Sequence, residues 1–375
     1  MIKHRWLSAL SLVLAFSLLL CSCSLFGREE ESSSSEGEGE SVAELPAEYP
    51  ITVSGNVING RPGKVVSLAD SITEKIYDLG MEESLVGVSD YCDYPEEVSR
   101  LYRCGTALTP NVDAIADSMA TMVISVIPLT DADTAALEAE GVQVVVLEAP
   151  RTLDALWQTY YDVGRILEGD TNGVRMSTEF VDNLKSWANS LQAAVQDAVN
   201  APGEDGEPTG TKVAMYLREL DYTVATGDTL ESAMLELIGL ENFAKNQTDW
   251  TYPEEAANSE EGIAAFRSVE IAYYDERFVT IKDLEGSAFY KGLPSTLYDW
   301  YHYIDCIAFE RQSLSMFEEL LGMAEYAWPE ANLPSWPYAS HGAAETDPTD
   351  ETDTGDTPDG EGQDAGDGEE VAVDE

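Results

Sequence analysis

The feature that most constrains the fold is a long central stretch, residues 152–201, that carries no strand pattern. Its apolar side chains recur at the spacing of an α-helix, first at Leu153, Leu156, Tyr160, Val163, Ile166 and Leu167, and later at Phe180, Leu184, Trp187, Leu191, Val195 and Val199. The pattern predicts a long helical connector, with a break near Asn172-Gly173. The parts of the chain on either side of it must therefore fold as separate lobes.

Strand and helix patterns alternate before the connector. Short β-branched runs predict strands at residues 64–68, 85–88, 122–127 and 142–147. Residues 71–79 and 131–140 predict helices, each followed by a glycine. Because alternation of this kind is typical of a parallel sheet with crossover helices, residues 50–150 are expected to form an α/β lobe.

The same alternation resumes after the connector. A loop rich in Pro, Gly and Glu comes first, and then patterns for a strand, a helix, a strand and a closing helix follow at residues 213–217, 230–240, 269–274 and 314–326. A body of roughly 290 residues exceeds what one hydrophobic core usually organises. We therefore expect the fold class α/β, with two Rossmann-like lobes (residues 50–150 and 202–335) joined by the helical connector at 151–201.

The amino terminus has the pattern of an export signal. Lys3 and Arg5 precede an apolar run, Leu7 to Leu20, that is short for a stable membrane span. The following Leu20-Cys21-Ser22-Cys23 resembles a bacterial lipobox, which implies that residues 1–22 are removed and that Cys23 carries lipid. We expect an extracytoplasmic protein attached to the cell membrane through that lipid alone. An ordinary signal peptide cut elsewhere is the alternative.

Two segments have compositions that cannot bury much apolar surface. Residues 23–49 are rich in Ser, Glu and Gly, and residues 336–375 are acidic with few apolar side chains, so both are expected to be disordered. The whole chain holds 71 Asp and Glu against 20 Lys and Arg, a formal net charge of −51. The body keeps an acidic excess without these segments, which excludes a nucleic-acid partner because phosphates would be repelled.

Three cysteines remain after the signal and lipidation sites are set aside: Cys92, Cys104 and Cys306. An odd number requires at least one free thiol. In an oxidising compartment Cys92 and Cys104 could form a local disulfide or stay as two thiols, and the sequence leaves both open.

Several runs resemble the substrate-binding proteins of ABC importers for iron complexes, haem and vitamin B12. They are Val65 to Leu68, Ser71 to Glu74, Val86 to Ser89, Tyr91-Cys92-Asp93-Tyr94-Pro95, Leu237 to Ala244 and Ala308-Phe309-Glu310-Arg311. The resemblance covers about residues 60–330 and implies the class III periplasmic-binding-protein fold, in which one rigid backbone α-helix bridges two lobes. The chain departs from the family at Leu240, where a second Gly is usual, and in the aromatic stretch at 288–305.

The resemblance implies a binding protein and not an enzyme. It implies capture of a metal chelate (ferric siderophore, cobalamin or haem) between the lobes, delivery to an ABC permease and its ATPase, no intrinsic cofactor or metal site, and a monomer. Catalysis is poorly supported by the residues, because the chain has three His and neither a Gly-rich phosphate loop nor a Cys-Xaa-Xaa-Cys pair. A chelatase-like or nitrogenase-like α/β enzyme, or a surface binding lipoprotein without a transport role, is the alternative.

Candidate ligand contacts follow from position, because ligands of open parallel sheets bind at the carboxyl ends of the strands. They are Tyr91, Tyr94 and Thr106 in the first lobe and Arg218, Thr226, Trp250 and Asp305 in the second. Aromatic faces suit a corrin, a porphyrin or catechol rings, and Arg218 would pair with a ligand anion or with Glu219 or Asp221. For Tyr301 and His302, packing on the lobe is favoured over iron ligation.

A second recognition surface is implied by the resemblance. Each lobe of these proteins presents an acidic side chain to arginines of the permease, and the matching positions are Asp113 and Glu261, or its neighbour Glu260. Charge pairing of this kind fixes the docking register and speeds encounter.

Overall fold

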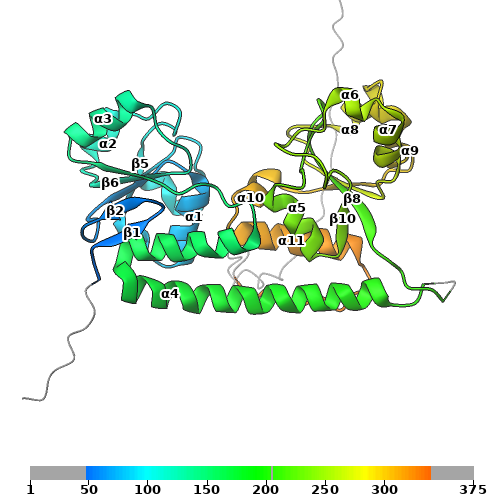
Figure 1. Cartoon of the computed structure of the whole chain (residues 1–375), viewed down its shortest axis with the longest axis horizontal. Coiled ribbons are helices and arrows are strands. Elements are labelled where there is room, and N and C mark those ends of the chain that lie inside the picture. Colours follow the sequence, from blue (N-terminus) through cyan, green and yellow to red (C-terminus); the bar gives the residue numbers. More distant parts are fainter. Residues whose placement is uncertain (1–47, 204–205, 339–375) are drawn as a thin grey trace, which may run out of the picture. The chain divides into compact units, whose positions relative to one another are not determined.

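The computed structural model describes residues 48–203 and 206–338, all within one unit, Pro46–Glu375 (Figure 1). The predicted signal peptide, the lipid site Cys23 and most of the two low-complexity segments lie outside the described residues. Within that part of the chain, no helix combines the length and the apolarity that crossing a membrane requires.

Five short parallel strands form the sheet of the N-terminal lobe, as the alternation predicts. They are β3 (Val65–Ser67), β4 (Leu85–Val88), β5 (Tyr102–Arg103), β6 (Met122–Ser125) and β7 (Gln143–Val146). Their order is β5-β4-β3-β6-β7, so the direction of winding reverses between β3 and β6. A crevice forms outside the carboxyl ends of the strands at such a reversal.

Helices cover this sheet at the places that the sequence indicates. The helical elements are α1 (Asp70–Asp78), η1 (Glu82–Ser84), η2 (Glu96–Arg100), α2 (Val112–Asp117) and α3 (Asp131–Ala139). Side-chain caps start two of them: Asn111 accepts from the amide of Ala114, and Thr130 accepts from that of Asp133, both at 3.1 Å. A hairpin that the pattern did not predict, β1 (Ile51–Val53) with β2 (Asn56–Ile58), precedes the sheet.

The C-terminal lobe has a second sheet of the same kind. Strands β8 (Lys212–Glu219), β10 (Leu240–Asn242), β11 (Ile271–Tyr274) and β12 (Tyr301–Tyr303) are parallel in the order β10-β8-β11-β12, and β9 (Thr223–Val224) pairs antiparallel with β8. Its helical elements are α5 (Leu230–Leu237), α6 (Glu254–Ala257), α7 (Glu260–Arg267), α8 (Ile281–Gly286), η3 (Tyr290–Gly292), α9 (Pro294–Leu297), α10 (Cys306–Glu310) and α11 (Leu314–Ala327). The predicted fold class, two parallel α/β lobes with a long helical connector, is confirmed.

The connector, α4 (Leu153–Asn200), is a helical hairpin. Gly169 has φ 85° and ψ −179°, which ends a first arm at residue 168 and starts a second arm at residue 170. The arms run side by side (Figure 1), and the Tyr160 and Phe180 rings lie 5.0 Å apart across them. The break was expected near Asn172-Gly173 but lies earlier, at Gly169. This glycine adopts a backbone conformation that residues with a Cβ atom disfavour.

Two residues that were assigned to the amino-terminal tether are part of the fold. The Glu48 carboxylate accepts from the amides of Thr171 (2.8 Å) and Asn172 (3.4 Å), and so caps the second arm of α4. The Tyr49 hydroxyl donates to the Ile166 carbonyl at 2.9 Å. At the other end the predicted tail began at residue 336, yet Trp336 packs edge-on against Trp187 with ring centroids 4.9 Å apart.

One hydrophobic core extends beneath both sheets. It includes side chains from the N-terminal lobe, from both arms of α4 and from the C-terminal lobe, among them Ile72, Ile76, Leu156, Leu184, Leu191, Leu235, Phe317 and Leu320. Smaller clusters cover the outer faces of the two sheets. The lobes are therefore joined by a shared base as well as by the connector.

Charged side chains are buried where the lobes meet. Helix α1 carries Glu74, Lys75 and Asp78, and the segment between α10 and α11 lies against them: the Lys75 ammonium donates to the Gln312 carbonyl, and the Leu314 amide donates to Asp78 at 3.3 Å. Burial lowers the pKa of Lys75 to about 8 and raises that of Asp78 to about 8. Burial therefore disfavours the charged form of both groups.

Candidate cleft between the lobes

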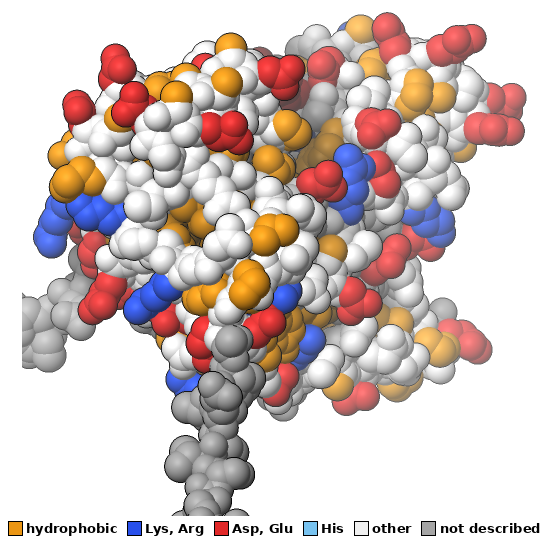
Figure 2. All heavy atoms as spheres, turned by 60° about the vertical axis from the view of Figure 1, so that its left-hand side comes forward, with side chains coloured by type: hydrophobic (Ala, Val, Ile, Leu, Met, Phe, Trp, Pro, Cys, Tyr) orange, Lys and Arg blue, Asp and Glu red, His pale blue; other side chains and the backbone are white. Residues whose placement is uncertain are grey.

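Loops that follow strands of the N-terminal lobe meet the C-terminal lobe in two places. Asp93, which follows β4, lies 2.6 Å from an Arg311 nitrogen, and Arg151, which follows β7, lies 2.7 Å from Asp228. The surface is hollowed between the lobes (Figure 2), and acidic side chains greatly outnumber basic ones on the face shown. The geometry places the candidate site in this hollow, between loops that the sheet topology already singled out.

Exposed apolar side chains gather on these loops. They come from the loops after β4, β5 and β6 in the N-terminal lobe and from the ends of β11 and β12 in the C-terminal lobe: Tyr91, Leu108, Ile127, Phe278 and Tyr303. Tyr91 is the extreme case, with 78% of its surface exposed. Exposed rings and branched side chains on both sides of a hollow are typical of a site for a large, partly apolar ligand.

In the N-terminal lobe, the Tyr91–Pro95 loop is held so that Tyr91 points outward. The Arg103 guanidinium donates to the carbonyls of Ser89 (3.1 Å) and Cys92, and the Asp90 carboxylate accepts from the Gly105 amide at 3.0 Å. The half-buried Tyr94 ring lies 5.1 Å below the guanidinium of Arg311. Thr106, the third predicted contact of this lobe, bonds its hydroxyl to Thr109 (3.0 Å) within the same turn.

In the C-terminal lobe, Arg218 belongs to an ion pair and a ring stack. Its Nε lies 2.8 Å from Glu310, and its guanidinium lies 3.5 Å from the centre of the Phe278 ring. Of the two alternatives, a ligand anion or the neighbouring Glu219 or Asp221, the second is not what the structure shows: the partner is Glu310, which also accepts from the Tyr216 hydroxyl at 2.8 Å. Burial raises the pKa of Glu310.

Thr226 and Trp250 support a turn beside these groups. Thr226 is fully buried; its hydroxyl donates to Asp228 at 2.7 Å and accepts from the Trp250 amide at 3.1 Å. It is therefore not accessible to a ligand in this structure, which corrects its prediction as a contact. The half-buried Trp250 ring packs edge-on against Tyr216, with centroids 5.9 Å apart.

Asp305 caps α10 and completes a second ion-pair cluster. Its carboxylate accepts from the Ala308 amide at 2.9 Å and pairs with Arg277, which also pairs with the buried Asp275. Burial alone would raise the pKa of Asp275, but the hydrogen bonds from Arg277 lower it overall. Both carboxylates are engaged, so Asp305 contributes local order at the carboxyl end of β12.

A continuous row of side chains links the two lobes. It runs from the Tyr94 ring to Arg311, along the chain to Glu310, and then to Arg218 and the Phe278 ring. Reasoning from the sequence identified Tyr94 and Arg218 but missed the three others. Ala308-Phe309-Glu310-Arg311 was noted as a family resemblance, yet a local pattern does not show which distant groups its charges meet.

The aromatic segment before α10 packs on the lobe, as the favoured interpretation stated. The His302 ring stacks on Tyr326 of α11 with centroids 4.0 Å apart, and burial lowers the pKa of His302. The Tyr301 hydroxyl contacts those of Ser295 (3.3 Å) and Thr296 (3.0 Å). Among the described residues, three or more His, Cys, Asp or Glu side chains nowhere group so that they could hold a metal ion.

The three cysteines of the body are free and buried. Cys92 and Cys104, for which the sequence left a disulfide open, are separate thiols in the structure. Burial raises the pKa values of Cys92, Cys104 and Cys306 to about 12, 11 and 12. All three therefore lack the thiolate character that reactive cysteines have.

The acids expected to face a permease are exposed. Asp113 lies in the first turn of α2, and Glu260 and Glu261 lie in the first turn of α7. Both helices lie on the side of the structure away from α4 (Figure 1).

A cavity of about 670 Å³ lies elsewhere, lined by the end of the second arm of α4, Lys212 and Trp328. It adjoins the start of β8 and so is not part of the hollow at the carboxyl ends.

Comparison with known proteins places the chain among binding proteins. The model of a family described as "Periplasmic binding protein" matches residues 65–277. An ABC transporter substrate-binding lipoprotein of Bacillus subtilis, YvrC, is 25% identical over 212 residues, 54% of this chain and 63% of its own length. A cobalamin-binding protein of Halobacterium salinarum is 22% identical over 220 residues, 56% of each chain. The matches thus span roughly 60% of the curated relatives' length.

Solved structures share the fold. The periplasmic haem-binding protein HutB of Vibrio cholerae has a TM-score of 0.58 and 19% sequence identity, and the match covers 71% of this chain and 99% of HutB. At this identity the likeness concerns the fold.

Proposed function

Because the chain belongs to the periplasmic binding protein family, we propose that it is the extracytoplasmic substrate-binding component of an ABC importer. It captures a metal chelate between its lobes and delivers it to a membrane permease with its ATPase. Lipid on Cys23 keeps it at the membrane surface, and the unit acts as a monomer.

The observation that carries this proposal is the set of exposed rings at the carboxyl ends of strands in both lobes. Tyr91 presents a ring from the N-terminal lobe, and Phe278 and Tyr303 present rings from the C-terminal lobe. Large, rigid aromatic faces bury much apolar area at low entropy cost, and so they suit the flat or bulky ring systems of chelates. The relatives described as binding cobalamin or haem support the same ligand class. A ferric siderophore or a cobalamin is the favoured ligand, and haem is the next candidate.

A catalytic role has little support from the same groups. Arg218, Arg277 and Arg311 are all paired with carboxylates, and Glu310 and Asp305 are engaged in turn. General acid–base chemistry needs a group that is free to exchange a proton with a substrate. We propose that these pairs shape the site and that binding involves no chemical step.

A titration of the purified protein tests the ligand class. We expect one of three probes (a ferric siderophore, cyanocobalamin or haemin) to quench tryptophan fluorescence at micromolar or lower concentration, because Trp250 lies beside the row of groups that links the lobes. The variant Trp250→Phe should lose part of the quenching. Absence of any change with all three probes would remove the ligand proposal.

A further inference from the structure

We propose that Arg311 is a positioning residue: from the C-terminal lobe it fixes the position of the ligand-binding loop Tyr91–Pro95 in the opposite lobe. The inference deepens the proposed function and rests on it for the meaning of the loop. It concerns how one side of the site is held in place by the other.

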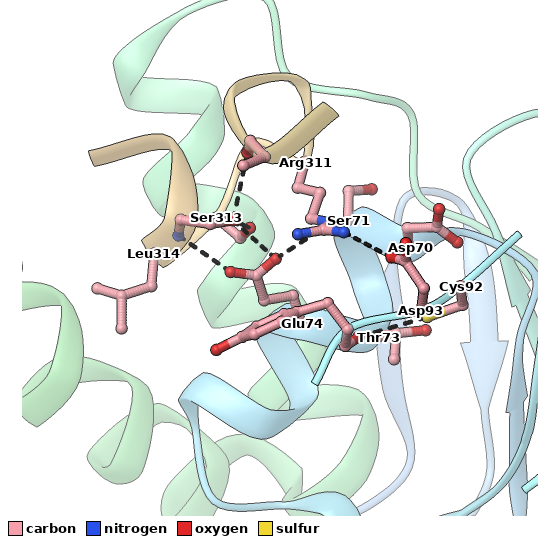
Figure 3. Close-up of polar contacts among 12 residues, drawn as sticks. Asp70, Ser71, Thr73, Glu74, Cys92, Asp93, Arg311, Ser313 and Leu314 are labelled. Carbon is pink, nitrogen blue, oxygen red and sulfur yellow. Dashed lines mark hydrogen bonds and ion pairs between the residues drawn. The ribbon is translucent and has the colours of Figure 1, made fainter. Parts of the chain in front are cut away.

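The contacts of Arg311 all lead into the N-terminal lobe. Its Nη2 donates to Asp93 at 2.6 Å, its Nε lies 3.9 Å from Glu74, and its guanidinium lies 5.1 Å from the centre of the Tyr94 ring. The side chain is 11% exposed, although its main-chain position is at the end of α10. Figure 3 shows it reaching between Glu74 and Asp93.

Glu74 fixes the direction in which Arg311 points. Its side chain is 1% exposed and accepts two hydrogen bonds from Ser315, from the amide at 3.0 Å and from the hydroxyl at 2.8 Å. Because Ser315 and Arg311 flank the same short segment, the buried carboxylate is anchored on one side and faces the guanidinium on the other. The arginine is thereby oriented before any ligand arrives.

The loop receives opposite supports from the two lobes. From within the N-terminal lobe, Arg103 donates to the carbonyl of Cys92 in the loop and to that of Ser89 just before it, whereas Arg311 holds the Asp93 carboxylate and covers the Tyr94 ring. Tyr91, the most exposed ring of the candidate site, precedes the two residues that Arg311 contacts in the same loop. Movement of Arg311 would therefore loosen the end of the loop that follows Tyr91.

The chemistry of the contacts requires arginine. A planar guanidinium can pair with two carboxylates and lie over a ring at once, whereas a lysine ammonium on a flexible stem is a point charge. An exposed ion pair in isolation contributes little. Here the arginine is 11% exposed and is oriented by the buried, anchored Glu74, whereas the Asp93 carboxylate that it holds is 74% exposed.

A ligand-free experiment tests the positioning directly. We would compare the wild type with Arg311→Gln and Asp93→Asn by hydrogen exchange of the amides of Tyr91 and Cys92 and by alkylation of the Cys92 thiol with N-ethylmaleimide, both resolved by mass spectrometry. We expect both rates to rise about 5- to 30-fold in each variant, since a charge-assisted bond is lost. The two substitutions change the local charge in opposite directions, so electrostatic effects on the thiol cannot produce the same acceleration in both.

Arg175→Gln is the matched control, because Arg175 is exposed on the second arm of α4 and bonds to Asn172. It should leave both rates unchanged. The proposal is overturned if the two variants exchange like the wild type, or if exchange rises throughout the lobe and not in the loop.

The ligand arm uses the same variants with the ferric siderophore, cyanocobalamin and haemin. Both single variants should bind about 5- to 30-fold more weakly, the double variant no more weakly than Arg311→Gln, and Arg311→Lys should recover only part of the loss. Tighter binding by Asp93→Asn would overturn the proposal, because it would mean that Arg311 contacts the ligand itself. If the wild type binds none of the probes, the proposed function fails while the exchange experiment still decides the role of Arg311.

Discussion

The bend in α4 makes a sharp prediction, because it depends on one glycine. Gly169 has φ +85° and ψ −179°, and a Cβ built there would lie 2.5 Å from the Glu48 carboxylate and 2.7 Å from the Glu48 Cβ. Gly169→Ala must therefore strain the backbone and also displace the side chain that caps the second arm. Backbone strain of this kind costs about 1–3 kcal/mol. Loss of an N-terminal cap costs about 1 kcal/mol more.

We therefore expect Gly169→Ala to lower the free energy of unfolding by about 2–4 kcal/mol, measured by urea denaturation followed by circular dichroism. Glu48→Ala should lose the cap alone, about 1 kcal/mol. Gly322→Ala is the matched control, because Gly322 lies within α11 and a Cβ there would meet nothing within 4 Å. That control should be neutral or stabilising by up to about 1 kcal/mol.

The reasoning would be refuted if Gly169→Ala changed the free energy of unfolding by less than about 0.5 kcal/mol, the range of ordinary surface substitutions. It would also be refuted if Gly322→Ala were as damaging, since the loss would then not depend on the bend.

Three further predictions concern other parts of the molecule. Burial raises the pKa of Glu231 from 4.5 to about 7, so the folded state holds a proton that the unfolded chain releases. The free energy of unfolding should therefore fall by up to about 3 kcal/mol as pH rises from 4.5 to 7. Glu231→Gln should flatten that pH dependence in urea denaturation. Charge reversal at Asp113 and Glu261 should impair uptake in cells and leave the affinity of the purified protein intact; weakened affinity would contradict a docking role. The buried thiols should resist alkylation in the native protein and react once it is denatured, and fast labelling of Cys104 or Cys306 in native buffer would contradict their burial.

The parallel sheets were predictable because most of their strands are short, buried β-branched runs that alternate with helical patterns along the sequence. Two edge strands were not: β5 is two exposed residues, and β12 reads Tyr-His-Tyr without an apolar alternation. The helix predicted at residues 230–240 ends at Leu237 and is followed by β10, because Gly239 has φ +71° and turns the chain. Such features depend on tertiary position, which the local pattern does not contain.

The candidate site also combines features that could be predicted from the sequence with features that could not. Its loops could be predicted, since the carboxyl ends of parallel strands follow from the topology; Tyr91 lies on one of them and Arg218 lies at the carboxyl end of β8. The pairing of their charges could not. Arg311 and Asp93 are 218 residues apart, and nothing in either neighbourhood distinguishes this pair from other possible pairs of unlike charge.

The segment from Gln312 through α11 has a consequence for the order in which the chain folds. It supplies hydrogen-bond partners to Glu74, Lys75 and Asp78 and packs Phe317 and Leu320 into the core beneath α1. A chain synthesised from its amino terminus exposes these charged groups and this apolar surface until the last helix arrives. The N-terminal lobe therefore lacks part of its base until nearly the whole chain is present, and a truncation before residue 312 should yield an unstable product.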